Sequence, residues 1–118
     1  MVASRALPVG IVTNVGADHQ RRKLAMVGLA GCFDVVVGLD TLGFGKPDPR
    51  VFHHACGLLG TQPGDTFFVG DRLDHDAVGA RDAGLRAVWL DRSGGAANDV
   101  PAGVTRVTSL AELEPVVA

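Results

Sequence analysis

Short apolar runs alternate with amphipathic segments along the whole chain. The apolar runs predict strands over residues 9–14, 34–38, 65–70, 86–90 and 104–107. The amphipathic segments predict helices over 18–27, 50–59 and 74–83, and a last helix from Ser109 through Leu113. Strands that alternate with helices at this spacing are typical of βαβ units. We therefore predict an α/β fold, a Rossmann-like parallel sheet flanked by helices, in one domain over residues 1–118.

Local signals refine two of the helices. Asp48 followed by Pro49 predicts the start of the helix over 50–59, and Gly84 predicts the end of the helix over 74–83. The segment 40–49 is rich in glycine and proline and is predicted to be a loop. Residues predicted to face inward lie at helical spacing: Leu24, Val27, Val51, Phe52, Ala55, Leu58 and Leu59.

Composition excludes several classes of function. The chain has 118 residues, of which 47% are hydrophobic, and its formal net charge is −2, so no basic face for nucleic acid is expected. No stretch is long and apolar enough to span a membrane, and Met1–Pro8 has no signal-peptide core. The two cysteines, Cys32 and Cys56, follow no metal-binding spacing and are predicted to be buried thiols. These features favour a cytoplasmic protein.

Carboxylates gather where the strand over 65–70 ends. Asp71, Asp74 and Asp76 follow Gly70 within six residues. Carboxylate oxygens at such a turn suit Mg²⁺, and a cation would relieve their mutual repulsion. Capping of the next helix by Asp71 or Asp74 is the alternative, and Arg72 could also relieve the repulsion.

Two other polar segments are expected at the same edge of the sheet, because chemistry collects at the carboxyl ends of parallel strands. Lys46 lies between Gly45 and Pro47, where a lysine can present a point charge to a phosphate, although a loop lysine can also simply be solvated. Thr13 and Asn14 end the first strand, where a hydroxyl and backbone N–H groups can bind a phosphate oxygen or merely form a turn.

Taken in order, these segments resemble the motifs of the haloacid dehalogenase superfamily. Residues 11–14 (Ile-Val-Thr-Asn) look like its second motif, and 45–49 (Gly-Lys-Pro-Asp-Pro) like its third. Residues 69–71 (Val-Gly-Asp) with Asp76 look like its fourth motif. The resemblance covers essentially the whole chain, and it implies a Mg²⁺-dependent hydrolase of small phosphate monoesters.

The resemblance also implies roles for individual residues. Thr13 would bind the transferring phosphoryl group, helped by Asn14, and Lys46 would neutralise the phosphate and the attacking carboxylate. Asp71 would hold Mg²⁺, directly or through water, with Asp76 supporting it. Dehalogenase chemistry fits less well, because Asp71 and Lys46 match the phosphatase pattern.

The family's first motif, an apolar strand that ends in Asp-x-Asp, is not found before Thr13. The first aspartate of the chain is Asp18, and the single Asp-x-Asp is Asp74–Asp76. Because the family's chemistry needs a carboxylate nucleophile, we expect the chain alone to be inactive and to bind Mg²⁺ weakly. The missing motif would also supply the central strand of the sheet.

Three interpretations follow from this departure. The chain is a truncated phosphatase, one part of a two-chain enzyme, or a non-enzymatic descendant that binds phosphate, Mg²⁺ or a protein. Without the central strand, two buried strands have free edges, which would pair with each other, with Met1–Pro8 or with a partner chain. We expect self-association or a partner chain at these edges.

Overall fold

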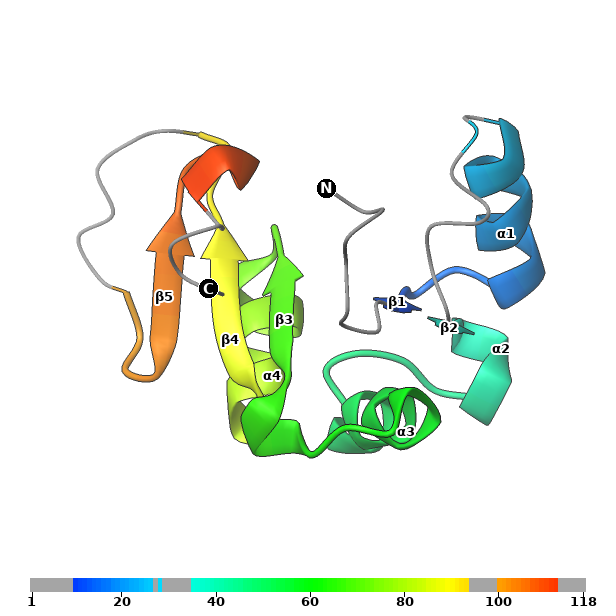
Figure 1. The fold of residues 1–118 in the computed structure, drawn as a ribbon, viewed down its shortest axis with the longest axis horizontal. Coiled ribbons are helices and arrows are strands. Elements are labelled where there is room, and N and C mark those ends of the chain that lie inside the picture. The colour runs from blue at the N-terminus through cyan, green and yellow to red at the C-terminus, as the bar shows by residue number, and fades with distance from the viewer. Residues whose placement is uncertain (1–9, 27, 29–34, 94–99, 113–118) are drawn as a thin grey trace.

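The strands in the part of the chain that the structure describes form two parallel sheets. The computed structural model describes residues 10–26, 28, 35–93 and 100–112. The first sheet pairs β1 (Gly10–Val12) with β2 (Val35–Val37), and the second has the order β3 (Phe67–Gly70), β4 (Arg86–Leu90), β5 (Val104–Val107). Helices flank both sheets (Figure 1). The predicted Rossmann-like α/β fold is thus confirmed.

The two sheets are not joined by a backbone ladder within the part of the chain that the structure describes. There β1 pairs with β2 and β3 pairs with β4, so β1 and β3 do not pair with each other. Figure 1 shows the sheets on either side of the molecule, with β1 and β3 as the strands that face one another. This is where the sequence predicts a missing central strand; Met1–Pro8 lies outside the described residues.

Helices connect the strands with three departures from the predicted pattern. Where a last helix is predicted from Ser109 through Leu113, the described residues form only a 3₁₀ turn over Leu110–Glu112. The helices are α1 (Ala17–Met26), α2 (Leu39–Leu42), α3 (Pro49–Leu59) and α4 (Gly79–Asp82), with a π-helix η4 (Leu73–Val78) and 3₁₀ turns η3 (Pro63–Asp65) and η5 (Leu110–Glu112).

The second departure is α2, a short helix in a segment predicted to be a loop. Its turn closes because Thr41 N–H donates to the Gly38 carbonyl at 3.1 Å, while the Gly38 N–H donates to the Thr41 hydroxyl at 2.9 Å. The third departure is η4, which begins the predicted helix over 74–83. The N–H groups of Asp76 and Ala77 both donate to the Arg72 carbonyl, at 3.0 and 3.2 Å, which widens this turn.

The ends of α3 agree with the prediction. Asp48 is the N-cap and its Oδ1 accepts from Arg50 N–H at 3.0 Å, while Pro49 occupies the first turn. Gly60 ends the helix with φ of 73°, a backbone conformation that glycine adopts without steric cost. The loop that precedes α3 is therefore fixed at a defined helix start.

The main core lies where α3 packs beside η4, α4 and the starts of the strands. Its buried members are Val51, Phe52, Cys56, Ala77, Ala80, Ala83, Leu85 and Ala87. Phe52 is fully buried and packs edge-on against Phe68 of β3, with ring centroids 5.0 Å apart. Ala55 and Cys56 are buried as predicted, whereas Leu58 is 54% exposed, because it lies on the side of α3 away from this core. Leu59 is half-buried, and Val27, Cys32 and the side chain of Leu24 lie outside the described residues.

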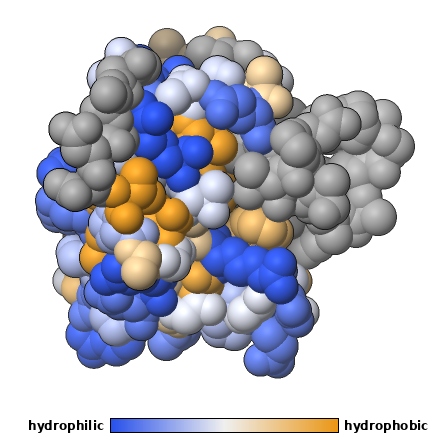
Figure 2. All heavy atoms as spheres, turned by 90° about the vertical axis from the view of Figure 1, so that its left-hand side faces the viewer, coloured by the Kyte–Doolittle hydropathy of each residue, from blue (hydrophilic) through white to orange (hydrophobic). Residues whose placement is uncertain are grey.

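A smaller core lies on the other face of the second sheet. Val88, Leu90 and Val107 are buried there, with Phe67 and Val69 packed against them. Figure 2 shows the side of the molecule nearest β5, where hydrophobic side chains reach the surface in patches among hydrophilic ones. In the described part of the chain, the helices are all too short or too polar to cross a lipid bilayer.

Candidate functional site

The polar segments singled out by the sequence lie at the carboxyl ends of β1 and β3. Thr13 and Asn14 follow β1, Asp71 follows β3, and the loop with Lys46 precedes α3. Hydrogen bonds join these segments although they are about 30 residues apart. This is the edge of a parallel α/β sheet where ligands bind.

Lys46 and Asp76 form a buried ion pair. Lys46 Nζ lies 2.6 Å from Asp76 Oδ1, and the two side chains are 13% and 6% exposed. The ammonium also lies 5.6 Å from the centre of the Phe68 ring. The second carboxylate oxygen of Asp76 accepts from Arg72 N–H at 3.1 Å. Both oxygens of Asp76 are therefore engaged within the protein.

Gly70 makes room for Asp76 at the end of β3. A Cβ atom at this position would lie 2.3 Å from the Cβ of Asp76, far inside contact distance. Only a glycine lets the strand pass this close to the carboxylate, which explains the glycine before Asp71.

Asn14 holds the backbone of Lys46 at both of its polar groups. Lys46 N–H donates to Asn14 Oδ1 at 2.8 Å, and Asn14 Nδ2 donates to the Lys46 carbonyl at 3.1 Å. The neighbouring Gly45 leaves space for this contact, because a Cβ there would lie 2.4 Å from Asn14 Oδ1. The turn after β1 and the loop before α3 are thus tied together.

Thr13 takes part in the turn that follows β1. Its N–H donates to the Val37 carbonyl at 2.9 Å, and its hydroxyl oxygen accepts from Val15 N–H at 3.3 Å. A turn role is one of the two alternatives that the sequence allows for Thr13, and the structure shows this contact. The hydroxyl hydrogen is still available to a ligand oxygen.

Asp71 is exposed, and its backbone rather than its carboxylate is held. Trp89 Nε1 donates to the Asp71 carbonyl at 3.3 Å. The guanidinium of Arg106 lies 6.0 Å from the centre of the Trp89 ring, and it pairs with Asp91 at 3.0 Å. The main chain at Asp71 is therefore fixed while its carboxylate faces solvent.

The remaining residues of this acidic turn differ in setting. Asp74 is exposed, and hydrogen bonds from His75 hold the pKa of its carboxyl below the usual value. His75 is half-buried, with Nδ1 3.0 Å from Asp74 Oδ1. Neither Asp71 nor Asp74 caps a helix, because Arg72 precedes η4 and no side chain caps it.

The acidic turn offers one free carboxylate to a metal ion. No three His, Cys, Asp or Glu side chains come together as a metal site in the ranges that the structure describes. Asp71 presents exposed oxygens of the type that Mg²⁺ prefers, whereas Asp76 already binds Lys46 and Arg72 N–H. Of the acidic residues in this turn, Asp71 is the one whose carboxylate would be available to hold a Mg²⁺ ion.

Sequence reasoning brings Thr13, Asn14, Lys46 and Asp71 to one edge but misses two contacts. It does not pair Lys46 with Asp76, and it does not place the Asn14 side chain on the Lys46 backbone. Two glycines in the sequence are the signals that could have indicated these contacts. A Cβ at Gly45 would collide with the Asn14 side chain, and a Cβ at Gly70 would collide with Asp76.

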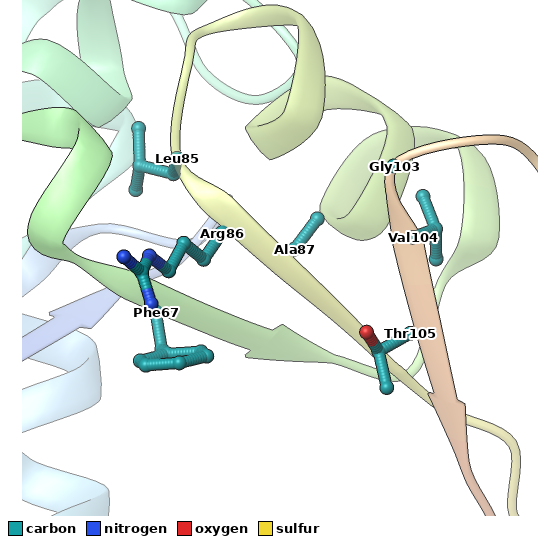
Figure 3. A pocket seen from close by; sticks show the side chains of 7 residues that line it. All are labelled: Phe67, Leu85, Arg86, Ala87, Gly103, Val104 and Thr105. Carbon is teal, nitrogen blue, oxygen red and sulfur yellow. The ribbon is translucent and has the colours of Figure 1, made fainter. Parts of the chain in front are cut away.

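A hollow of about 540 Å³ lies at the opposite end of the second sheet. It is lined by residues at or next to the amino ends of β3, β4 and β5, among them Phe67, Arg86 and Thr105 (Figure 3). The guanidinium of Arg86 lies 5.4 Å from the centre of the Phe67 ring, and Arg86 Nε donates to the Gly64 carbonyl at 2.8 Å. None of the predicted site residues lines this hollow, so it is distinct from the polar cluster.

A curated phosphatase and two solved structures match most of this chain. A phosphoserine phosphatase from Thermus thermophilus is 46% identical over 88 residues, which are 75% of this chain and 35% of that protein. The solved structure of a phosphatase from Thermococcus onnurineus is 35% identical with a TM-score of 0.83, and the match covers 94% of this chain and 50% of that one. A 2-haloacid dehalogenase structure from Pseudomonas syringae is 32% identical with a TM-score of 0.78, covering 93% of this chain and 45% of that one.

The chain thus spans about a third of the curated phosphatase and about half of the solved structures. Residues 2–84 match the model of one protein family, and this range includes all three polar segments of the site. The chain belongs to the haloacid dehalogenase-like hydrolase family.

Proposed function

We propose that this chain carries the phosphate-binding and Mg²⁺-binding part of a phosphate monoester hydrolase. The observation that supports this most directly is that Lys46 joins the two strand ends, because its backbone binds Asn14 and its ammonium binds Asp76. A lysine anchored at a strand end that also carries a hydroxyl and backbone N–H groups has the chemistry that suits a phosphate dianion. The phosphatase relatives support the same substrate class, small phosphate monoesters.

Each residue has one role in this proposal. Thr13 donates its hydroxyl to a phosphate oxygen, and Lys46 neutralises the negative charge that gathers around phosphorus. Asp71 holds Mg²⁺ with its exposed carboxylate, and Asp76 supports this turn by accepting from Arg72 N–H. The metal ion would supply a further positive charge on the phosphate oxygens.

The attacking carboxylate is proposed to come from polypeptide outside these 118 residues. No aspartate precedes Asp18, and the single Asp-x-Asp ends in Asp76, which is buried against Lys46. Both aspartates of this pair lie in η4, after β3, and not at the end of a strand before Thr13, where the family resemblance places the attacking carboxylate. We propose that residues 1–118 are a partial core domain of a truncated, cytoplasmic phosphatase. A second chain that supplies the carboxylate, and a non-enzymatic binding protein, are the alternatives.

Binding of inorganic phosphate in the presence of Mg²⁺ tests the proposal. We expect calorimetry to detect weak binding by the 118-residue chain, and Lys46→Gln to weaken it by about tenfold or more, because a charge-assisted contact is lost. Asp65→Asn, which changes a charge near the amino ends of the strands, is the control and should bind as the wild type does. Phosphate binding that is indifferent to Lys46→Gln contradicts the proposed site.

Turnover of an aryl phosphate tests the missing nucleophile. We expect none from the purified chain. Hydrolysis that depends on Mg²⁺ and disappears in Lys46→Ala would show that the chain holds its own attacking group.

Dehalogenase activity is the second candidate, because a structural relative carries that name. Asp71 distinguishes the two, since dehalogenation uses no Mg²⁺ and leaves an exposed acidic side chain at this position without a role. Phosphate binding that Mg²⁺ strengthens in the wild type, but not in Asp71→Asn, favours the phosphatase. Phosphate binding that is equal with and without Mg²⁺ would leave Asp71 without a metal to hold and would favour the dehalogenase.

A further inference from the structure

The side chain of Asn14 is placed to set the position of Lys46. Its amide group faces the main chain of Lys46 and exchanges two hydrogen bonds with it, at 2.8 and 3.1 Å. This is the pairing that one backbone amide makes with another in a sheet, here made by a side chain across 32 positions of sequence. The loop before α3 is thereby held to the end of β1.

The same contact limits where the Lys46 ammonium can stand. Asn14 fixes the backbone of Lys46 at one end of the side chain, and Asp76 fixes Nζ at the other end at 2.6 Å. A lysine side chain has four rotatable bonds and loses much conformational entropy when it is held. With both ends fixed beforehand, little of that loss remains when an anion binds.

We infer that Asn14 is a positioning residue that acts through Lys46 rather than a phosphate ligand in its own right. The sequence alone groups Asn14 with the phosphate-binding residues. In the structure one amide hydrogen and the amide oxygen of Asn14 are engaged by Lys46. The inference rests on the proposed function for what Lys46 does, but not for the contact itself.

Gly45 offers an independent way to break the contact. A Cβ at this position would lie 2.4 Å from Asn14 Oδ1, so Gly45→Ala displaces the amide while leaving Asn14 in the chain. Val15→Ala is the matched control, because Val15 is in the same turn and its side chain is 39% exposed.

The first experiment measures hydrogen exchange of the Lys46 amide by NMR in the 118-residue chain. We expect this amide to exchange about tenfold faster or more in Asn14→Ala and in Gly45→Ala, and at the wild-type rate in Val15→Ala. Unchanged amide shifts in β3–β5 identify the variants that are folded. If the Lys46 amide exchanges at the wild-type rate in either variant and that variant is folded, the inference is overturned.

The second experiment asks whether Asn14 acts through Lys46, using inorganic phosphate with Mg²⁺ and a double-mutant cycle. We expect Asn14→Ala to weaken phosphate binding by about tenfold in the wild type and by less than about twofold in Lys46→Gln. Equal losses in both backgrounds would show that Asn14 contacts the anion directly, and would overturn the inference. If the wild type binds no phosphate, the proposed function fails, and the exchange of the Lys46 amide still decides the positioning role.

Discussion

At the scale of single residues, the ion pair between Lys46 and Asp76 carries the strongest energetic expectation. Removing one partner leaves the other charge buried, and this costs on the order of 3 kcal/mol. We expect Lys46→Met and Asp76→Leu each to lower the free energy of unfolding by about that amount in urea titrations.

The double variant provides the control for this prediction. Lys46→Met combined with Asp76→Leu replaces the pair by apolar groups. The double variant should therefore lose clearly less unfolding free energy than the sum of the two single variants' losses. Single losses below about 1 kcal/mol would mean that the pair behaves as an exposed ion pair.

Gly70 and Gly57 give a second prediction at the residue scale. Gly70→Ala places a Cβ 2.3 Å from the Asp76 Cβ, so we expect a loss of at least about 2 kcal/mol in unfolding free energy. Gly57 lies within α3, and a Cβ added there would meet no other atom within 4 Å, so Gly57→Ala should raise stability by about 0.8 kcal/mol. Equal effects of the two changes would contradict the close approach at Gly70.

At the scale of elements, the start of α3 depends on the charge of Asp48. Hydrogen bonds from the Arg50 side chain and backbone lower the pKa of Asp48 from 3.8 to about 2. Because the folded value is the lower one, the stabilisation is present above pH 3.8 and is lost as the pH falls through about 2.

Thermal unfolding of Asp48→Ala checks this expectation. The melting temperature should be lower than that of the wild type at neutral pH, and the difference should shrink between pH 3.8 and about 2. Asp48→Asn keeps a capping side chain without the charge, so its loss should be smaller at neutral pH. This loss should shrink with falling pH by a similar amount, because neither variant titrates at position 48. A difference that is constant across this range would rule out the charge as its cause.

Trp89 makes the acidic turn accessible to a direct metal experiment. It is the one tryptophan of the chain, and its indole N–H donates to the Asp71 carbonyl at 3.3 Å. If Mg²⁺ binds the Asp71 carboxylate, we expect the tryptophan emission to change with Mg²⁺ concentration and to stop changing in Asp71→Asn. Asp65→Asn should keep the response, and a response that survives Asp71→Asn would place the metal elsewhere.

Most of these elements are predictable from the sequence because their signals are local. Asp48 and Pro49 locate the start of α3, and alternation of apolar runs with helices predicts the parallel sheets. The pattern misses α2 because that helix depends on the Thr41 hydroxyl and the Gly38 backbone within a glycine-rich segment. It also misses η4, whose widened turn comes with the burial of Asp76 against Lys46, a contact between residues 30 positions apart.

The candidate site is predictable in its location but not in its pairing. Thr13 and Asp71 follow the carboxyl ends of parallel strands, as the topology predicts. Lys46 lies in the loop before α3, and its contacts to Asn14 and Asp76 join it to these strand ends. Which atom meets which depends on side-chain packing that local sequence does not encode. The partners of Asn14 and Asp76 are therefore visible only in the structure.

At the scale of the whole molecule, the strand edges that face each other lead us to expect self-association. The edges of β1 and β3 that lie away from β2 and β4 carry backbone groups without a ladder partner in the described residues. We expect the mass from light scattering to rise with protein concentration, and amide exchange over 10–12 and 67–70 to slow in parallel. A constant monomer mass at high concentration would contradict this expectation.

Because no ladder joins β1 to β3 in the described residues, the distance between the turn after β1 and the acidic turn after β3 is set by other contacts. Hydrogen-bonded strands hold their neighbours at a fixed separation, whereas packed side chains set a separation through their size and shape. Here Phe52 of α3 packs against Phe68 of β3 with ring centroids 5.0 Å apart. Lys46 also joins the two parts, because its backbone binds Asn14 and its ammonium binds Asp76. Side-chain contacts, one of them an aromatic pair whose Phe68 ring lies 5.6 Å from the Lys46 ammonium, thus join the Thr13–Asn14 turn to the acidic turn where a strand ladder does not.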